Sequence, residues 1–555
     1  MKKDWWKKSV VYQIYPKSFK DSNGDGFGDI VGIIEKLDYL KKLGVDILWI
    51  TPMYVSPQND NGYDIANYYE IDPKFGTMEN FEILLKKAHE KGIKIIMDMV
   101  VNHTSTEHEW FKKALENKNS KYHNYYIWKE NKGKIPNNWA SKFGGSAWEY
   151  IEKLDEYYLH LFDITQADLN WESNELRKEI YKMMRFWLDK GIDGFRLDVV
   201  NLLSKDSSFK DDTYEKVNDD GRKYYTDGPK IHEYLQEMNR EVFSKYEDII
   251  TVGEMSSTNI ENSIKYTNEE RKELNMVFNF HHLKVDYLNG DKWSLMEYNF
   301  KELRDILFSW QEGMQAGQGW SALFWSNHDQ PRNISRFGNT KEYFNESGKT
   351  LGTAIHLMRG TPYIYQGEEI GMENPDFDSI EMYRDIESLN NYKILLEKGL
   401  TEKQVLEILK NKSRDNARTP IQWNGEKNAG FSNKEPWIPV GKNYKNINIE
   451  NALREKASIF YHYKKLIKLR KKYDVISHGS FKKVYENQDG IFAYERIYSN
   501  EELLVVCNFS IEEKEIVIED KFLKDGKVLI STYGDIFIEK KLKLKPFESF
   551  AYLIK

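Results

Sequence analysis

Three carboxylate side chains follow short apolar runs at separated places in the sequence. The runs are GFRLD at 194–198, TVGE at 251–254 and WSNHD at 325–329, and they end in Asp198, Glu254 and Asp329. A fourth run of the same kind, DMVVNH at 98–103, ends in His103. Such a run is typical of a strand that is buried on both faces. If the strands are parallel, their carboxyl ends meet at one rim, where three acids could cleave a glycosidic bond.

The first two acids suit a retaining glycosidase, which needs a nucleophile and a proton donor about 5 Å apart. Asp198 is the expected nucleophile, because Arg196 lies two residues earlier on the same strand face and can hold it ionised. Glu254 is the expected general acid and later base. Its pKa should be raised by burial and by a neighbouring anion, whereas the pKa of Asp198 should be low.

The third acid, Asp329, would orient sugar hydroxyls and favour a positively charged transition state. His103 and His328 can donate hydrogen bonds to hydroxyls of the same ring. Taken singly, each run could instead hold a buried ion pair that closes a barrel. The recurrence of the pattern in four runs favours the catalytic interpretation.

The composition limits the kind of protein. A chain of 555 residues is too long for one compact core, so we expect one large domain with satellites. The net charge of −7 does not favour a nucleic-acid partner. Aromatic residues make up 14% of the chain, which suits either a sugar-binding cleft or an aromatic core. The single cysteine, Cys507, cannot form an internal disulfide, and no stretch reaches 18 apolar residues. We therefore expect a cytoplasmic protein without a membrane partner, and we leave its oligomeric state open.

Eight apolar runs alternate with helical patterns, which favours a (β/α)8 barrel. Three of the helical patterns end at a glycine, namely Gly44, Gly92 and Gly191. The connection after the third run is too long for a barrel loop, and a second excursion covers about 371–431. The last barrel helix is expected over 459–471. The runs lie at 10–15, 47–53, 94–101, 194–200, 248–255, 276–280, 322–326 and 362–365.

The pattern changes after Tyr473 to alternating segments that are separated by turns. This alternation is typical of antiparallel strands with one buried face. We expect the barrel over 1–103 and 172–475, an inserted subdomain over 104–171, and a small antiparallel β-domain over 476–555.

These runs resemble the conserved sequence regions of the α-amylase family, glycoside hydrolase family 13, and the resemblance extends over essentially the whole chain. It implies a (β/α)8 barrel with an inserted B subdomain and a C-terminal β-sandwich. It also implies that Asp198 is the nucleophile, Glu254 the acid and base, and Asp329 the third carboxylate.

The resemblance further implies a pocket for one terminal glucose. The segment QNDNGYD at 58–64 is similar to the part of α-glucosidases that holds this sugar, with Asp60 on its hydroxyls and Tyr63 as a stacking platform. Arg414 resembles the arginine that completes the subsite, and Phe162 its apolar wall. A pocket closed around one glucose implies an exo-acting enzyme.

A possible metal site lies near the N-terminus, in DSNGDGFGD at 21–29. Its alternating oxygen ligands look like the start of a calcium loop, but position twelve is Gly32 rather than glutamate. The residues alone favour an Asx turn without metal. The family resemblance favours a structural Ca²⁺, and no cofactor is expected for catalysis. The ligands would be Asp21, Asn23, Asp25, the carbonyl oxygen of Phe27, and Asp29.

A basic loop after the sixth run bears on the substrate. Four cationic side chains lie within twelve residues there, and a cluster of this kind could bind a phosphate dianion. Together with neighbouring strings, the loop resembles family members that cleave α,α-trehalose 6-phosphate into glucose and glucose 6-phosphate with retention. The expected phosphate ligands, in order of preference, are Lys292, Lys284, His281 and His282.

Other substrates and functions remain open on the sequence alone. The nearest alternative is an oligo-1,6-glucosidase that acts on isomaltose-type linkages, with a basic loop of no consequence. A glucosyltransferase or sugar isomerase on the same scaffold would have to keep water from the glucosyl-enzyme. A non-catalytic relative would lose the three acids. If the phosphate role is right, Lys292→Ala should raise KM for the phosphorylated substrate and spare an uncharged aryl glucoside.

Overall fold

The computed structural model describes residues 4–213 and 220–555. Eight parallel strands form one sheet in the order β13-β12-β11-β5-β2-β1-β15-β14. A parallel bridge between Val277 of β13 and Ser321, next to β14, brings the two ends of the sheet together. The predicted barrel is confirmed, and each predicted run overlaps one strand. The strands are β1 (Val11–Ile14), β2 (Ile47–Ile50), β5 (Lys94–Met99), β11 (Gly194–Leu197), β12 (Ile250–Glu254), β13 (Met276–Phe278), β14 (Ala322–Leu323) and β15 (Thr361–Tyr365).

The sequences of the strands are continuous apolar runs because both faces of each strand are buried in the barrel. Every residue of β1, β2, β11, β12 and β15 is buried. Gly194 opens β11 with a φ of 145°, and a Cβ there would lie 1.8 Å from the carbonyl oxygen of Ile250 in β12. Only glycine permits this close approach of the two strands that carry the first two acids.

Helices surround the barrel and begin and end at local sequence signals. Thr77 and Asn80 form a capping box at the start of α3, and Gly44 adopts the left-handed conformation after α2. The helix expected to end at Gly44 is divided into α1 and α2 at Lys36. The main helices are α1 (Ile30–Glu35), α2 (Leu37–Leu43), α3 (Met78–Glu90), α5 (Asn174–Asp189), α6 (Ile231–Glu241), α7 (Ile260–Thr267), α8 (Phe300–Ala316), α10 (Phe344–His356) and α15 (Ile459–Lys472).

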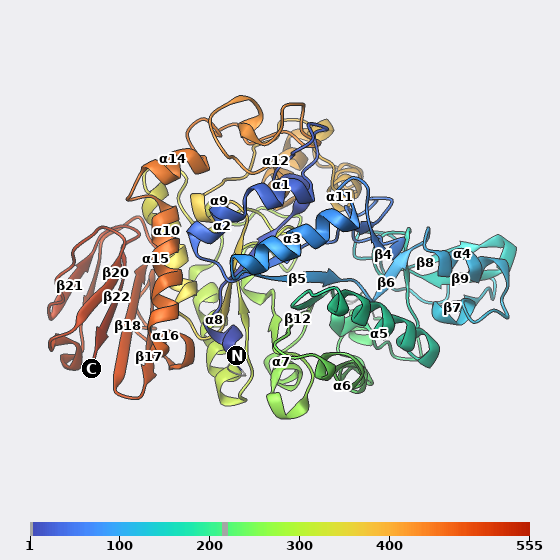
Figure 1. The fold of residues 1–555 in the computed structure, drawn as a ribbon, viewed down its shortest axis with the longest axis horizontal. Helices are drawn as coiled ribbons and strands as arrows, with labels where there is room; N and C mark the ends of the chain where they lie inside the picture. The colour runs from blue at the N-terminus through green and yellow to red at the C-terminus, as the bar shows by residue number, and fades with distance from the viewer. Residues whose placement is uncertain (1–3, 214–219) are drawn as a thin grey trace.

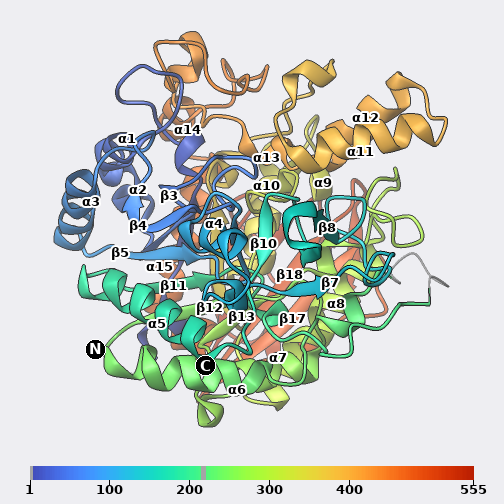
Figure 2. The same cartoon turned by 90° about the vertical axis from the view of Figure 1, so that its right-hand side faces the viewer.

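Small sheets are inserted after the third barrel strand. One is an antiparallel sheet of β7 (Trp128–Glu130), β9 (Glu156–Leu159) and β8 (Trp148–Ile151), and the other pairs β6 (His103–Ser105) with β10 (Gln166–Asp168). They lie beyond the carboxyl end of β5, on the right in Figure 1, and face the viewer in Figure 2. The insertion therefore covers the rim where the acids were predicted. The exact domain boundaries stay predictions.

The second excursion contains a helical hairpin, which the sequence analysis did not resolve into elements. It consists of α11 (Ile386–Glu397) and α12 (Glu402–Lys412), followed by the short α13 (Asp415–Arg418). Both long helices lie above the barrel in Figure 1. Asp385 caps α11 by accepting a hydrogen bond from the Ser388 N–H at 3.0 Å. The hairpin thus places Asp385 and Arg414 near one another at the same rim.

The C-terminal part forms two packed antiparallel sheets, which confirms the predicted β-sandwich. A shared core contains Val506 and Phe550 from the larger sheet and Ile516 and Leu542 from the smaller one. The other face of the larger sheet packs on the barrel, where the rings of Phe492 and Phe308 lie 4.7 Å apart. The larger sheet has the order β16 (Ser480–Val484), β17 (Ile491–Tyr498), β18 (Glu501–Asn508), β22 (Ser549–Ile554) and β20 (Lys527–Ser531), and the smaller one pairs β19 (Lys514–Val517) with β21 (Lys541–Leu544).

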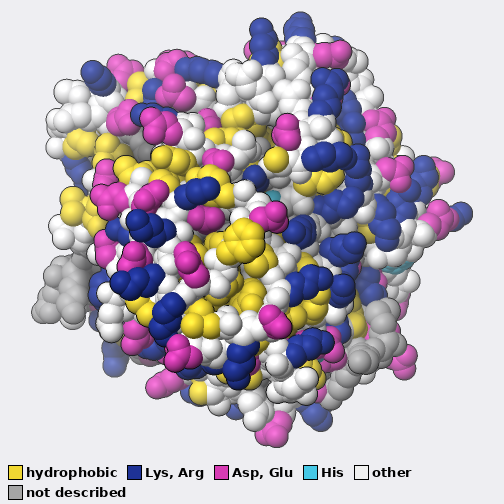
Figure 3. All heavy atoms as spheres, turned by 90° about the vertical axis from the view of Figure 1, so that its left-hand side faces the viewer, with side chains coloured by type: hydrophobic (Ala, Val, Ile, Leu, Met, Phe, Trp, Pro, Cys, Tyr) yellow, Lys and Arg dark blue, Asp and Glu magenta, His cyan; other side chains and the backbone are white. Residues whose placement is uncertain are grey.

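The side of the molecule formed by the C-terminal domain is turned toward the viewer in Figure 3. Acidic and basic side chains are mixed there, with hydrophobic side chains between them. Among the described residues, no helix combines the length and the apolar character needed to cross a membrane.

Candidate active site

One arginine joins the first two predicted acids. Arg196 Nη1 donates to Asp198 Oδ1 at 2.6 Å, and its Nη2 donates to Glu254 Oε2 at 2.5 Å. The same Nη1 also donates to Asp98 Oδ1 at 2.7 Å. All four side chains are buried. The expected nucleophile and the expected acid therefore lie against one guanidinium, which fixes their relative positions.

A single cation faces three carboxyl groups here, so their protonation is coupled. Burial, against the opposing effect of Arg196 and together with the charges of Asp198 and Asp329, raises the pKa of Glu254 to about 7. Burial also raises the pKa of Asp198 to about 7. The expectation for Glu254 is confirmed. The expected low pKa of Asp198 was wrong, because the loss of hydration outweighs the nearby arginine. Near neutral pH the carboxyl group of Glu254 is therefore still partly protonated, as a general acid requires.

The residue after the nucleophile has a strained backbone. Val199 adopts a left-handed conformation with φ 34° and ψ 40°, which is rare for a β-branched residue. In this conformation its N–H donates to Glu254 Oε2 at 3.1 Å. The strain therefore serves to hold the proton donor against the end of β11.

The third acid is held by different cations. Asp329 Oδ1 accepts a hydrogen bond from Arg418 Nη2 at 2.7 Å, and Oδ2 lies 3.0 Å from His328 Nε2. Burial alone would raise the pKa of Asp329, but His328, Arg414 and Arg418 together hold it well below the usual range. Asp329 is therefore ionised, as a group that stabilises positive charge must be. The ring of Tyr63 stacks on His328 at 5.2 Å.

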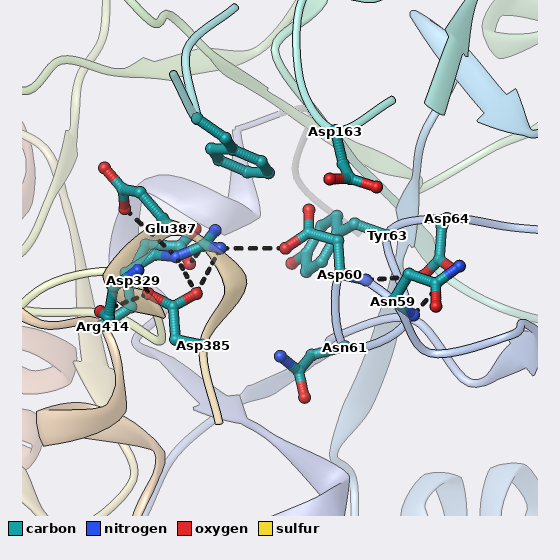
Figure 4. A network of polar contacts seen from close by, with 12 residues as sticks. Asn59, Asp60, Asn61, Tyr63, Asp64, Asp163, Asp329, Asp385, Glu387 and Arg414 are labelled. Atoms are coloured by element: carbon teal, nitrogen blue, oxygen red, sulfur yellow. Dashed lines mark hydrogen bonds and ion pairs between the residues drawn. The ribbon is translucent and has the colours of Figure 1, made fainter. Parts of the chain in front are cut away.

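The predicted glucose pocket is organised around Arg414. Its Nη2 donates to Asp60 Oδ1 at 3.0 Å and to Asp385 Oδ1 at 2.5 Å, and its Nε lies 3.4 Å from Glu387 Oε2 (Figure 4). Gln166 Nε2 donates to the second oxygen of Asp60 at 3.1 Å. Asp60 and Arg414 come from distant parts of the chain and form one ion pair, which suits the closed end of a pocket.

The remaining predicted sugar contacts join the same network. Tyr63 donates its hydroxyl to Asp98 Oδ2 at 2.9 Å. His103 Nε2 lies 3.2 Å from Gln166 Nε2, and the ring of Phe162 lies 5.1 Å from that of His103. The fold thus brings the expected catalytic and glucose-binding residues together.

Of the four predicted phosphate ligands, Lys284 lies at the site. It lines a pocket of about 180 Å³ together with Glu254 and Asp329. Among the described residues, no carboxylate lies within ion-pair distance of its ammonium group. The other residues lining this pocket are Ser256, Phe280, Leu283, Tyr287 and Gln330.

The other three predicted phosphate ligands do not line this pocket, and their phosphate role stays a prediction. The short helical turn over His281–Leu283 directs His281 toward Trp310 of α8, with ring centroids 5.2 Å apart. His282 is buried and its Nε2 lies 2.9 Å from the carbonyl oxygen of Phe324. Lys292 forms an ion pair with Glu387, with its Nζ 2.7 Å from Oε2. Proximity in the sequence did not fix these directions, because a turn points successive side chains to different sides.

The proposed calcium loop is ordered by its own hydrogen bonds. Asp21 accepts from the N–H groups of Gly24 at 2.6 Å and Gly26 at 2.9 Å, and Asp29 accepts from Ser22 N at 2.9 Å. Phe27 N donates to Asp25 Oδ1 at 2.8 Å. Within the described residues, no group of three His, Cys, Asp or Glu side chains has the arrangement of a metal site. The loop thus has the form of an Asx turn, and calcium binding stays a prediction.

Several residues of the site were missed by sequence reasoning. Asp98 begins the fourth run, and Arg418 lies four residues after Arg414, so both were present in strings already singled out. Their positions at a strand end and on one helical turn were the available signal. Nothing in the sequence indicates that Gln166 and Asp385 belong to the site. Their positions depend on how each insertion folds over the rim of the barrel.

An eight-stranded parallel barrel with three acids at its rim defines a glycoside hydrolase site. The family described as the α-amylase catalytic domain matches residues 13–479, and the α-amylase SusG C-terminal domain matches 491–550. The chain belongs to the α-amylase family, glycoside hydrolase family 13.

Individual relatives are similar over nearly the full length. The trehalose-6-phosphate hydrolase of Bacillus subtilis (strain 168) is 56% identical over 99% of this chain and 98% of its own. The oligo-1,6-glucosidase of Bacillus cereus is 51% identical over 100% of both chains. The crystal structure of trehalose-6-phosphate hydrolase from Bacillus licheniformis superposes with a TM-score of 0.94 at 58% identity, over 99% of each chain.

Proposed function

We propose that this protein is an exo-acting, retaining α-glucosidase that hydrolyses α,α-trehalose 6-phosphate to glucose and glucose 6-phosphate. The observation that carries the proposal is the position of Lys284, which shares a pocket with Glu254 and Asp329 and has no carboxylate partner among residues 4–213 and 220–555. A cation beside the proton donor suits an anionic group on the departing sugar. Relatives with this activity, at 56–58% identity, support the same proposal.

The proposed reaction uses the carboxyl groups in two steps. Asp198 attacks the anomeric carbon of the terminal glucose while Glu254 donates its proton to the glycosidic oxygen, and the phosphorylated sugar departs. Glu254, now ionised, takes a proton from water, which attacks the glucosyl carbon and releases Asp198. Asp329 stabilises the positive charge that develops on the ring in both transition states.

The pocket explains why the enzyme would act on chain ends. The Arg414–Asp60 ion pair, with a donor–acceptor distance of 3.0 Å, lies where a further sugar would continue past the terminal glucose. Tyr63 and Phe162 offer aromatic faces to the single ring that fits.

The alternative function is that of an oligo-1,6-glucosidase, which is supported by the 51% identity to the Bacillus cereus enzyme. It would use the same three acids and the same glucose pocket. The two functions differ in what the second sugar carries, so Lys284 is the residue that separates them.

The proposal is tested by product analysis. Incubation with α,α-trehalose 6-phosphate should release glucose and glucose 6-phosphate in equal amounts, and proton NMR should detect the α-anomer of glucose first. Asp198→Asn should abolish both products. A first-formed β-anomer would contradict the retaining mechanism, and no cleavage at all would contradict the proposed substrate.

A further inference from the structure

Lys284 belongs to a cluster of three basic side chains from separate segments. Lys142 comes from the inserted segment between β7 and β8, Arg222 from the connection after β11, and Lys284 from the loop after β13. Lys142 Nζ donates to Ser256 Oγ at 3.3 Å, and Ser256 lines the same pocket as Lys284 and Glu254. The N–H of Ala140 donates to the carbonyl oxygen of Asp220 at 3.1 Å, so the segment that carries Arg222 lies beside the segment that carries Lys142. The three segments therefore meet near the proton donor.

The positive charge of this cluster is only partly balanced. Arg222 donates to Asp220 at 2.9 Å and 2.6 Å. Among the described residues, neither Lys142 nor Lys284 has a carboxylate within ion-pair distance. Burial, followed by the charges of Arg222 and Lys284, lowers the pKa of Lys142 to about 8. Two partly buried ammonium groups beside a guanidinium are unfavourable alone and favourable once an anion neutralises them.

We propose that Lys142, Arg222 and Lys284 together bind the phosphate group of the second sugar, a phosphomonoester dianion, and so determine the preference for a phosphorylated disaccharide. This inference rests on the proposed function. The two ammonium groups, with the guanidinium nitrogen of Arg222 that Asp220 does not use, offer several donors to the oxygens of a phosphate. Lys142 and Arg222 carried no signal in the sequence, because their segments approach the loop after β13 only in the folded barrel.

The test compares a phosphorylated and an uncharged substrate. Lys142→Met and Lys284→Met should each lower kcat/KM for α,α-trehalose 6-phosphate about tenfold to a hundredfold, mainly through KM. Both variants should lose less on p-nitrophenyl α-glucoside, which carries no phosphate, so the ratio of the two kcat/KM values should fall by about tenfold. Lys113→Met, an exposed change on α4 (Glu109–Glu116), is the matched control and should change neither. Lys284→Arg should recover part of the lost efficiency.

The outcomes separate this inference from the proposed function. Equal losses on both substrates, or an unchanged efficiency on the phosphorylated one, would overturn the subsite while leaving the enzyme's preference intact. If the parent enzyme itself shows no preference for the phosphorylated sugar, the proposed function fails first. Inhibition by the product gives a second readout: glucose 6-phosphate should inhibit more strongly than glucose, and each lysine variant should reduce this difference.

Calorimetry provides a readout that does not depend on turnover. The groups that face Lys142 are Arg222, Lys284, Asp220 and Glu254. A bound phosphate should favour the charged form of Lys142, so binding of glucose 6-phosphate at pH 8 should take up protons. The measured heat should then depend on the ionisation enthalpy of the buffer, and Lys142→Met should remove most of that dependence. A heat independent of buffer in the parent enzyme would contradict contact between Lys142 and the phosphate.

Discussion

The ammonium group of Lys292 lies 2.8 Å and 2.7 Å from the two carboxylate oxygens of Glu387. Glu387 in turn lies 3.4 Å from Arg414 Nε, so the pair contacts the arginine that is predicted to complete the glucose subsite. Lys292 is therefore neutralised and positioned to act through Glu387. This relationship suggests a positioning role for Lys292 as an alternative to the phosphate role predicted from the basic loop.

Lys292→Met should lower kcat/KM about tenfold for the phosphorylated disaccharide and for an uncharged aryl glucoside alike. The reason is that Glu387, left without its partner, would pull Arg414 away from Asp60. Steady-state kinetics on both substrates measure this. Lys301→Met, at an exposed lysine of α8, is the control and should have no effect. A loss confined to the phosphorylated substrate would restore the original phosphate assignment.

The alkaline limb of the pH–activity profile should belong to Glu254. Its pKa is raised to about 7, so the proton needed by the leaving group is lost as the pH rises through 7. Glu254→Gln should lower kcat on the disaccharide by roughly 10²–10⁴-fold. The loss should be smaller for an aryl glucoside whose phenolate departs without a proton. An equal loss for both leaving groups would show that Glu254 is not the proton donor.

Ionisation of Glu254 should lower the free energy of unfolding at high pH. Because the folded-state pKa of Glu254 is raised, its contribution favours folding at low pH and is lost as the pH rises from about 4.5 through about 7. Glu254→Gln removes this cost. Its melting temperature should exceed that of the parent enzyme by about 1–3 °C more at pH 8 than at pH 5.5. A difference that does not change with pH would contradict the raised pKa.

Calcium binding to the loop at 21–29 can be tested by thermal melting. If Asp21, Asn23, Asp25 and Asp29 hold a structural ion, CaCl2 should raise the melting temperature of chelator-treated protein by a few degrees. Asp25→Asn, which preserves the side-chain shape at an exposed position, should weaken this response. Identical melting curves with calcium and with chelator would contradict calcium binding and would support an Asx turn without metal.

The barrel and its three acids could be predicted because the signals are local. Apolar runs mark buried parallel strands, and parallel strands place Asp198, Glu254 and Asp329 at the same rim. Gly44 marks a helix end through its left-handed conformation. The division of the first helix at Lys36 and the hairpin of α11 and α12 depend on packing, which no local pattern states.

The substrate-determining residues were harder to predict for a physical reason. A loop sequence gives the charges but not the directions of the side chains, so His281 and His282 were predicted, after Lys292 and Lys284, to lie at the same phosphate site, whereas the turn directs them elsewhere. The low pKa expected for Asp198 failed for a related reason, since burial could not be weighed against Arg196 before the site was assembled. Contacts made across insertions, such as Lys142 with Ser256, carry no sequence signal at all.

The most direct test of the central claim is the specificity constant on three substrates under one set of conditions. We predict that kcat/KM for α,α-trehalose 6-phosphate exceeds that for trehalose and for isomaltose by at least about a hundredfold, since the charge-assisted contacts of the basic side chains are lost without the phosphate. An equal or higher value for isomaltose would contradict it, and would assign the same three acids to an oligo-1,6-glucosidase.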